Sequence, residues 1–560
     1  MAMGSKAPNP TDGPTGARAL VDALVREGID HVFCIPGTQN LAILDALRET
    51  PAIRFILTRH EQGAAFMAYG FARASGKPAV VTATEGPGVT NLATGIAAAN
   101  RAYLPVISVC GVQESEIRER DSTQDLDQVT FMRPLTKWAY SIPNARKVQE
   151  SVRKAFRVAL TEPCGPTHIE AASEILLEPV ASETTDPAAY RTTERAACSE
   201  ASIDRAFKIL SDAQRPVFVV GRGVLNENAA AAMVTLAERV GIPVAALQYS
   251  PDAFPSTNRL ALGPLGRNGW ESANAVVPQA DAIIAIGAHM DVYSTTFKHG
   301  IFSKDAKLVH HTSAPGQIGI VFPVSVAVTG STASMIEGLT ARAIKTNLRK
   351  AWIDVAKVRD KHDSERAAIV KADAYPIQPQ FAAHAIREVL PANGMVVVDA
   401  GNAGKHVRNY FASYEPGTFI SIEDWGSVGG AFPIALGAKI ARPDRPVIAA
   451  AGDMGAMCNL AEFETAMREN IAVVLVVFND EGLGNERAFQ QVHYGGRLFA
   501  VDYRNPDFGA LARAFGAHGE QVRKPQDLKP ALTRALASGK PALVEVLIDQ
   551  NTLAPVVFKA

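Results

Sequence analysis

Two aspartates stand where apolar stretches end, 27 positions apart in the chain. Asp453 follows a run that ends at Gly452, and Asp480 follows a second run that ends at Asn479. In a parallel β-α-β unit both strand ends emerge at one edge of the sheet, so we expect the two carboxylates to converge. Carboxylates and a backbone carbonyl suit Mg²⁺, which usually shares its coordination shell with phosphates. The helix expected after Gly455 would offer N–H groups to phosphate oxygens at the same edge.

These features predict a magnesium-bridged diphosphate site. For either aspartate alone the competing interpretation is an ordinary helix cap, a position where Asp is common. The pair at this spacing favours the metal. A further candidate contact for the diphosphate is the run Gly401-Asn402-Ala403-Gly404, which follows another predicted strand, Met395–Asp399.

The elements that would position these residues recur in three successive parts of the chain. Short strands rich in Val, Ile and Ala alternate with Ala-rich helical stretches. This pattern predicts an α/β protein with three doubly wound parallel-sheet domains in series. The expected bounds are a disordered leader at 1–15, a first domain at 16–180, a linker at 181–201, a central domain at 202–344, a charged helical connector at 345–374, a third domain at 375–550 and a tail at 551–560.

Each predicted domain has four or five recognisable strands. In the first they are expected near Val32–Ile35, Arg54–Leu57, Ala79–Thr84, Val106–Cys110 and Thr167–Glu170. In the second they are expected near Val217–Val220, Val244–Ala246, Ala282–Ile286 and Leu308–His311. In the third they are expected near Met395–Asp399, Val447–Gly452, Val473–Phe478 and Ala542–Ile548.

Composition excludes several classes of function. With 56 Lys+Arg against 57 Asp+Glu, the chain has no overall positive field that would hold a nucleic acid. The longest apolar runs, such as Ile471–Phe478, are of strand length, so no membrane span is expected. The five cysteines have neither disulfide nor zinc spacing, and the leader lacks the apolar stretch of a secretory signal. A location in the reducing cytoplasm is therefore predicted.

The segment from Ala450 to Gly484 resembles the cofactor signature of thiamine-diphosphate-dependent enzymes. The resemblance lies in a Gly-Asp pair, an apolar strand and an Asn-Asp pair. The metal ligands that it implies are Asp453, Asp480 and the backbone carbonyl of Gly482, and the further cofactor contacts are Met454, Gly455 and Leu483. The sequence departs from the commonest form twice, with Met454 in place of Gly and Asp480 in place of Asn, and neither change removes a ligand.

A second segment, 58–111, resembles the pyrimidine-binding domain of the same enzymes, particularly of the acetohydroxyacid synthase, benzaldehyde lyase and 2-oxoacid decarboxylase branch. Glu61 matches the glutamate that hydrogen-bonds the pyrimidine ring nitrogen in that family. This bond favours the imino tautomer, which removes the proton from the thiazolium carbon. Without the family, Glu61 is an ordinary acid at a helix N-terminus.

A third segment, Asp424 to Pro433, resembles the loop that grips the pyrimidine. By this resemblance Val428 would support the V-shaped cofactor, and the carbonyl of Gly426 would accept a hydrogen bond from its exocyclic amine. The likeness extends from about Gly16 to Ile548 and implies thiamine diphosphate and Mg²⁺ as cofactors. It also implies a homodimer or homotetramer with active sites between chains. Some relatives bind FAD or a CoA nucleotide on the central domain, which nothing in this sequence requires.

The side chains expected over the thiazolium are Thr38, Gln39, Thr84, Glu85 and Gln124. Gln124 is similar to the Gln of synthases and benzaldehyde lyase, where simple pyruvate decarboxylases carry a histidine pair, so it favours carboligation or lyase chemistry. Two roles stay open for Glu85, a proton relay or a cap of its turn. Two also stay open for Arg487, a ligand for a substrate carboxylate or an ordinary exposed helix arginine.

The resulting hypothesis is an enzyme that decarboxylates a 2-oxoacid and transfers the acyl carbanion equivalent to a second carbonyl, as acetolactate synthases do. The helix after Leu483 lacks the tryptophan with which synthases choose their second substrate. An alternative is a lyase that cleaves a 2-hydroxy ketone or a 2-hydroxyacyl-CoA to an aldehyde. A third is a non-catalytic regulatory homologue, against which the retained Glu61, Asp453 and Asp480 argue.

Overall fold

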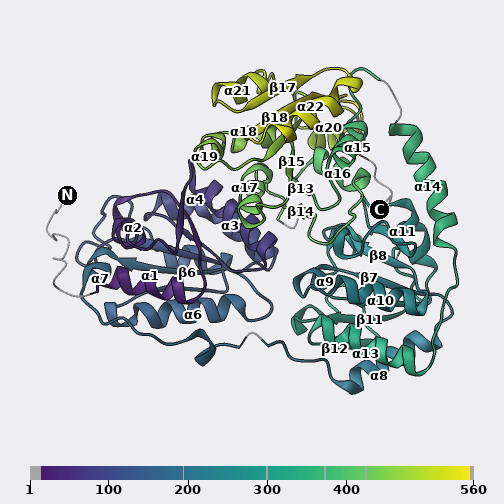
Figure 1. Cartoon of the computed structure of the whole chain (residues 1–560), viewed down its shortest axis with the longest axis horizontal. Helices are drawn as coiled ribbons and strands as arrows, with labels where there is room; N and C mark the ends of the chain where they lie inside the picture. Colours follow the sequence, from purple (N-terminus) through teal and green to yellow (C-terminus); the bar gives the residue numbers. More distant parts are fainter. Residues whose placement is uncertain (1–13, 193, 298–299, 371–373, 423–424, 555–560) are drawn as a thin grey trace. The chain divides into compact units, whose positions relative to one another are not determined.

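The computed structural model describes residues 14–554 except 193, 298–299, 371–373 and 423–424. Most of the predicted leader, Asp424 and the end of the predicted tail therefore lie outside the described residues. The described chain contains three six-stranded sheets in series, each parallel throughout and flanked by helices (Figure 1). This confirms the predicted α/β class with three doubly wound sheets. Within the described residues, no helix is both long and apolar enough to cross a membrane.

The first sheet has the strand order β2-β1-β3-β4-β6-β5. Its strands are β1 (His31–Cys34), β2 (Arg54–Leu57), β3 (Ala79–Thr82), β4 (Val106–Val112), β5 (Trp138–Ser141) and β6 (Thr167–Ala172). Its helices are α1 (Gly16–Arg26), α2 (Leu41–Arg48), α3 (Glu61–Ser75), α4 (Pro87–Arg101), α5 (Gln128–Met132), α6 (Val148–Leu160) and α7 (Ser173–Leu177). Helices α1 and α6 pack together and contribute to one core with the strands, whereas α3 and α4 pack against each other and the sheet.

The second sheet has the order β12-β11-β10-β7-β8-β9. Its strands are β7 (Pro216–Val220), β8 (Val244–Leu247), β9 (Ala261–Leu265), β10 (Ala282–Ile286), β11 (Lys307–Thr312) and β12 (Val326–Thr329). Its helices are α8 (Glu200–Asp212), α9 (Arg222–Asn226), α10 (Ala230–Val240), α11 (Glu271–Val276), α12 (Val292–Thr295) and α13 (Thr332–Lys345). Helix α14 (Val355–Val370) lies within the predicted connector. Two separate apolar cores cover the two faces of this sheet.

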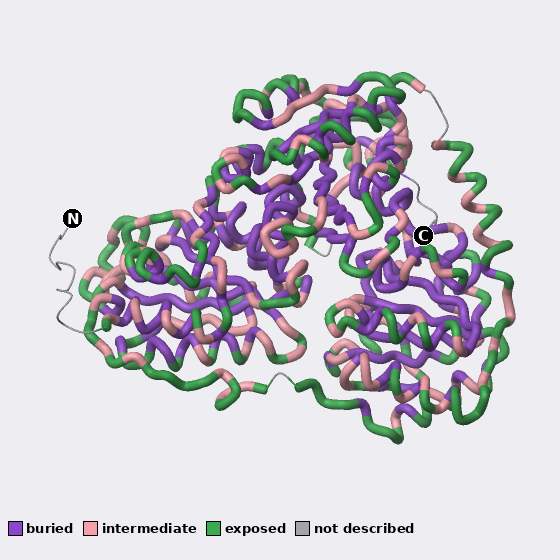
Figure 2. The backbone as a smooth tube through the Cα atoms, viewed as in Figure 1, coloured by how far each residue is buried: buried purple, intermediate pink, exposed green. Residues whose placement is uncertain are grey.

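The third sheet has the order β14-β13-β15-β16-β18-β17. Its strands are β13 (Met395–Val398), β14 (Phe419–Ser421), β15 (Val447–Gly452), β16 (Val474–Asn479), β17 (His518–Val522) and β18 (Ala542–Leu547). The helices of this part of the sequence are α15 (Pro379–Val389), α16 (Asn402–Tyr410), α17 (Ala431–Ala441), α18 (Asp453–Cys458), α19 (Glu462–Arg468), α20 (Gly484–His493), α21 (Phe508–Ala514) and α22 (Pro525–Ala537). Figure 2 shows the strands as mostly buried and the outer faces of many helices as exposed.

The described chain forms two compact units that do not follow the sequence order of the sheets. The first unit comprises the described residues of 1–193, 424–444 and 458–472, and the second comprises those of 194–423, 445–457 and 473–560. Helices α17 and α19 therefore belong to the first unit, with the first sheet, although the strands on either side of them belong to the third sheet. The predicted site residues divide between these two units.

Helices α3 and α17 approach each other at backbone distance inside the first unit. A Cβ on Gly70 of α3 would lie 1.9 Å from the carbonyl oxygen of Ile434, and one on Gly437 of α17 would lie 1.9 Å from that of Met67. Real Cβ contacts are never this short, so the crossing requires glycine on both helices. This contact anchors α17 to the helix that begins with Glu61.

Replacing Gly437 with Val should therefore destabilise the first unit. Overpacking of a close contact typically costs about 1–3 kcal/mol, and a β-branched side chain against a backbone carbonyl has no rotamer that relieves the overlap. We expect a lower midpoint in thermal unfolding followed by circular dichroism. Gly316→Val is the control, because a Cβ there meets no atom within 4 Å. Equal midpoints for the two variants would contradict the close crossing.

Candidate active site

Asp453 and Asp480 lie at the carboxyl ends of neighbouring strands, as the sequence predicts. Strands β15 and β16 pair in parallel with Gly452 opposite Phe478, so the residues that follow them emerge at one edge. Asp453 is 1% exposed and the Asp480 side chain is 8% exposed. Burial and the neighbouring Asp453 charge raise the pKa of Asp480 to about 7, against the opposing effect of Arg487. Two buried carboxylates that repel each other form an electrostatic site for a cation.

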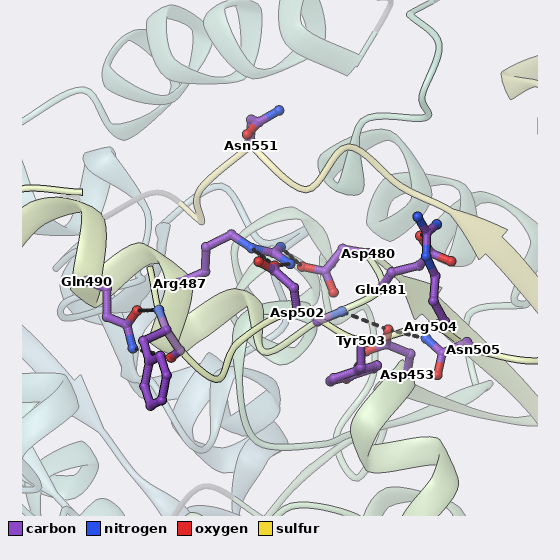
Figure 3. A network of polar contacts seen from close by, with 12 residues as sticks. Asp453, Asp480, Glu481, Arg487, Gln490, Asp502, Tyr503, Arg504, Asn505 and Asn551 are labelled. Carbon is purple, nitrogen blue, oxygen red and sulfur yellow. Dashed lines mark hydrogen bonds and ion pairs between the residues drawn. The ribbon is translucent and has the colours of Figure 1, made fainter. Parts of the chain in front are cut away.

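The side chain of Asp453 is held by four donors, and Figure 3 shows two of the residues that supply them, Tyr503 and Asn505, beside it. Its Oδ1 accepts from the Met454 N–H at 2.8 Å and the Tyr503 hydroxyl at 3.0 Å. Its Oδ2 accepts from the Gly482 N–H at 3.2 Å and from Asn505 Nδ2 at 2.7 Å. Burial raises the pKa of Asp453 and these hydrogen bonds oppose the rise. Because three of the donors come from beyond its own helix, Asp453 is more than a helix cap.

Tyr503 and Asn505, which the sequence analysis missed, reach Asp453 because the chain doubles back. Residue Gly482 forms an antiparallel bridge with Asp502, and the Tyr503 N–H donates to the carbonyl of Glu481 at 3.1 Å. The segment that returns, which includes Asp502 and Tyr503, follows α20, and its apolar residues show no regular spacing in the sequence. A Tyr-x-Asn pair in a polar loop gives no signal of its own, so only the three-dimensional pairing identifies these residues.

Arg487 of α20 is buried, so the expectation of an ordinary exposed helix arginine is wrong. Its Nη1 lies 3.1 Å from Asp480 Oδ2, and its Nη2 lies 2.6 Å from Asp502 Oδ1. Helix periodicity could not decide between the two roles, because it does not include the later segment, with Asp502, that covers this face of α20. A buried charge of this kind requires a partner, and here it has two.

The other predicted contacts of the diphosphate lie at the same edge of the third sheet. Gly401, with φ of 89°, precedes α16, which begins at Asn402 beside the loop that carries Asp480. A Cβ on Gly484 would lie 3.5 Å from Asn402 Cβ and 2.5 Å from Asp480 Oδ2. Three further predicted contacts lie in the first turn of α18 or immediately before α20: Met454, Gly455 and Leu483. Since β13 and β15 are adjacent, the starts of α16 and α18 are neighbours, which suits an anion.

The chemistry of this set fits a divalent cation bound to a diphosphate. Asp453, Asp480 and the carbonyl of Gly482 would supply three hard oxygens, and the mutual repulsion of the buried carboxylates would be relieved by positive charge. Among the described residues, no group of three or more His, Cys, Asp or Glu side chains is placed to hold a metal ion. This is compatible with a predicted set that contains only two such side chains.

Glu61 begins α3 in the first unit, at the carboxyl edge of the first sheet. Its side chain is buried, and its Oε2 accepts a hydrogen bond from Asn91 Nδ2 of α4 at 3.0 Å. A Cβ on Gly88 would lie 3.6 Å from Glu61 Oε1, so the Gly-Pro-Gly turn that starts α4 runs beside this carboxylate. Asn91 fixes one oxygen of Glu61 and is a residue that the sequence analysis did not identify.

A second acid, Glu462 of α19, holds the backbone immediately before Glu61. Its Oε1 accepts from the N–H groups of Arg59 and His60, each at 3.1 Å, and its Oε2 accepts from Thr465 Oγ1 at 2.6 Å. Burial raises the pKa of Glu462 to about 6. From sequence it is one acid among several in a short helix, and nothing marked it as a partner of residues about 400 positions away. It fixes the start of the helix that presents Glu61.

The predicted substrate residues come together at the same edge of the first sheet. Thr84 Oγ1 donates to Gln39 Oε1 at 2.5 Å. A Cβ on Gly86 would lie 2.6 Å from the carbonyl oxygen of Gln124, whose own φ is 71°. Thr38 is exposed at the start of the short helical turn that contains Gln39. The structure therefore brings three loops of the first unit together, and their side chains provide amide and hydroxyl groups.

Glu85 is fully buried, and neither carboxylate oxygen makes a hydrogen bond of good geometry. The proposal that it caps its own turn is therefore wrong, because a cap must accept from a backbone N–H. Burial raises the pKa of Glu85 to about 7, although the nearby Gln113 N–H opposes the rise. With a pKa near physiological pH, Glu85 can both take up and release a proton there, which suits proton transfer.

This environment predicts a pH-dependent effect of Glu85→Gln on stability. The folded pKa lies above the ordinary value of 4.5, so the folded state retains the proton between pH 4.5 and about 7 while the unfolded state loses it. The native glutamate therefore costs stability increasingly as pH rises through that window. The free energy of unfolding of E85Q, relative to that of wild type, should therefore rise by about 2 kcal/mol between pH 5 and pH 8, after allowance for solvent screening. Urea unfolding of both proteins at pH 5 and pH 8 measures this change. If E85Q and wild type differed in free energy of unfolding by the same amount at both pH values, the assigned environment of Glu85 would be contradicted.

The predicted pyrimidine loop is described from Trp425 onward. Gly426 and Gly429 have φ of 78° and 92°, which favours glycine at both positions. Val428 between them is 42% exposed. A partly exposed apolar side chain in a glycine-rich loop is suited to contact a ligand.

The fold and these residues define a class of cofactor-dependent α/β enzymes, and comparison with known proteins identifies the family. Three family models match in sequence order: "Thiamine pyrophosphate enzyme, N-terminal TPP binding domain" over residues 14–131, the "central domain" over 203–339, and the "C-terminal TPP binding domain" over 399–546. The chain belongs to the thiamine pyrophosphate (thiamine diphosphate) enzyme family, in its acetolactate synthase branch.

Individual relatives match over nearly the whole chain. A "Probable acetolactate synthase large subunit" of Methanocaldococcus jannaschii is 32% identical over 97% of this chain and 93% of its own length. A "Sulfoacetaldehyde acetyltransferase" of Alcaligenes xylosoxydans xylosoxydans is 31% identical over 96% of this chain and 93% of its own. An "Acetolactate synthase large subunit" of Haemophilus influenzae is 29% identical over 96% and 95%.

Proposed function

We propose that this enzyme is a Mg²⁺-dependent carboligase that decarboxylates a 2-oxoacid and joins the remaining acyl unit to a second carbonyl compound. The observation that carries the proposal is the pair of buried, mutually repelling carboxylates, Asp453 and Asp480, at neighbouring strand ends of a thiamine diphosphate enzyme. The relatives' names, which include a synthase and an acetyltransferase, support ligation over cleavage.

In this proposal Asp453, Asp480 and the Gly482 carbonyl hold Mg²⁺, and backbone N–H groups at the starts of α16 and α18 bind the diphosphate. When bound, thiamine diphosphate supplies a nucleophilic carbon and an electron sink. Glu61 exchanges a proton with the pyrimidine nitrogen, and Asn91 and Glu462 hold it in position. The Gly426 carbonyl would accept a hydrogen bond from the exocyclic amine of the cofactor, and the Val428 side chain would support the cofactor.

Substrate specificity would come from Thr38, Gln39, Thr84, Glu85 and Gln124. Because the Thr84 hydroxyl donates its hydrogen to Gln39 Oε1, it orients the Gln39 amide, whose N–H groups can donate to a substrate carboxylate or carbonyl oxygen. Glu85 would serve as a proton reservoir for the ligated product. We further propose a homodimer or homotetramer in the cytoplasm, with each active site shared between two chains, as in the family.

Product analysis with pyruvate, alone and with an aldehyde acceptor, tests the reaction. A carboligase releases one CO₂ for each 2-hydroxy ketone or acetohydroxyacid that it forms, detected together by headspace analysis and mass spectrometry. Absence of both products would overturn the proposal for pyruvate-derived acyl groups. The alternative lyase would instead convert a 2-hydroxy ketone to aldehydes without CO₂, which the same assay detects in the cleavage direction.

A further inference from the structure

Arg487 is a buried cation beside the proposed metal ligands, and the proposed reaction gives it no role. Its side chain is 3% exposed, near the start of α20. Figure 3 shows its guanidinium between Asp480 and Asp502. Nη1 lies 3.1 Å from Asp480 Oδ2, while Nε and Nη2 lie 3.2 and 2.6 Å from Asp502 Oδ1. The guanidinium therefore bridges two carboxylates.

The same guanidinium lies against a second proposed ligand. A Cβ on Gly482 would lie only 2.1 Å from Arg487 Nη2, so the guanidinium occupies the space that a side chain at position 482 would fill. Its positive charge is thus placed next to Asp480 and next to the backbone of Gly482. A divalent cation held by these residues would meet a resident positive charge at close range, where the repulsion is strong.

The two carboxylates that Arg487 joins differ in their exposure. The Asp480 side chain is 8% exposed and that of Asp502 is 62% exposed. An unpaired Asp480 would be costly because it is buried, whereas Asp502 is hydrated with or without the arginine. Ionised Asp480 is therefore stabilised by a cation beside it, and Asp502 can hold the guanidinium when another cation takes Asp480.

We propose that Arg487 is the exchangeable counter-ion of the metal site, paired with Asp480 when no metal is bound and retained by Asp502 when a divalent cation takes its place. The inference rests on the proposed metal site. It accounts for the aspartate at position 480, where the family commonly has Asn, because the additional negative charge is matched by Arg487. It also means that metal binding must break the Asp480–Arg487 pair, which lowers the affinity of the site for the metal.

The chain offers a matched control for each member of this network. Arg504 pairs with Glu481 at 3.0 Å in the same loop, but its side chain is 89% exposed and that of Glu481 is 44% exposed. R504Q and R487Q remove the same charge, and so do E481Q and D502N. Comparison within each pair separates a specific exchange from a general change of net charge, since exposed charges are largely screened.

The experiment measures Mn²⁺ binding to the cofactor-free enzyme by electron paramagnetic resonance, which counts free Mn²⁺ directly. R487Q should bind Mn²⁺ at least about tenfold more tightly than wild type, because no pair has to be broken. R504Q should change the affinity less than about twofold. In the D480N background, R487Q should change it less than about threefold, because the competition for Asp480 is gone.

D502N keeps the inference testable if R487Q folds poorly, since Asp502 is exposed. It should weaken Mn²⁺ binding at least about threefold, because Arg487 then has no second partner, whereas E481Q should change it less than twofold. Equal Mn²⁺ affinity of R487Q and wild type, or an equal effect of R487Q with and without Asp480, would overturn the inference. Absence of Mn²⁺ binding in wild type, R487Q and D502N alike would instead overturn the proposed metal site, so the two failures are distinguishable.

Discussion

Replacing Glu61 with Gln should lower kcat by about 10²–10⁴-fold, the usual contribution of a general acid–base group. Glutamine keeps the size of the side chain and can still accept from Asn91 Nδ2 through its carbonyl oxygen. It cannot exchange a proton with the pyrimidine nitrogen. We therefore expect the affinity for thiamine diphosphate to change much less than turnover, since the proposed diphosphate and metal contacts are unaltered. Steady-state kinetics and cofactor titration of the same preparation measure both quantities.

The control for Glu61 is another acid at the first position of a helix. Glu200 begins α8 and its side chain is 81% exposed, so Glu200→Gln removes a charge at a helix N-terminus without touching the proposed site. This variant should retain wild-type turnover. Full turnover of Glu61→Gln would contradict the assigned role, because the helix-dipole interpretation would then suffice.

Replacing Asp453 with Asn should remove most of the affinity for metal and cofactor. The substitution deletes one anionic ligand and turns an NH₂ group toward donors that now point at Asp453, among them the Gly482 N–H and Asn505 Nδ2. Hydrogen bonds to charged groups contribute about 1.5–3 kcal/mol, so with the lost metal contact we expect at least a 100-fold weaker affinity for thiamine diphosphate at saturating Mg²⁺. Equilibrium dialysis measures the bound cofactor directly.

Asp507 provides the matching control for Asp453. It is an N-cap of α21 and accepts from the Ala510 N–H at 2.7 Å, the role that Asp453 would have if it were only a cap. Asp507→Asn should cost little stability, because Asn caps nearly as well as Asp, and should leave cofactor binding unchanged. If D453N bound the cofactor as well as D507N does, Asp453 would not belong to the site.

The predicted strands are the interior strands of each sheet together with one edge strand, β2, and the strands that were missed are all at edges. These are β5, β9, β12, β14 and β17. An interior parallel strand is covered on both faces and is a continuous apolar run, as in Val474–Phe478. An edge strand can alternate buried and exposed residues, as β12 does, or be polar, as is His518–Val522. Such strands are defined by their pairing rather than by their composition.

The sequence could place Asp453 and Asp480 together because a general rule of parallel sheets fixes where strand ends emerge. No comparable rule places Tyr503, Asn505 or Glu462, whose contacts depend on how a polar loop returns and how a short helix packs. Arg487 shows the same limit, since helix periodicity alone could not show that a later segment covers it. Residues that position a site through distant contacts were found only in the structure.

The most direct test of the account is calorimetric titration of thiamine diphosphate into the wild-type enzyme with and without Mg²⁺. If Asp453 and Asp480 hold a metal ion against the diphosphate, Mg²⁺ and thiamine diphosphate must each increase the affinity of the enzyme for the other. Mg²⁺ should therefore increase the affinity for thiamine diphosphate at least 100-fold, and thiamine diphosphate should increase the affinity for Mg²⁺ by the same factor. Equal affinity for thiamine diphosphate at zero and saturating Mg²⁺, or no binding under either condition, would contradict the account.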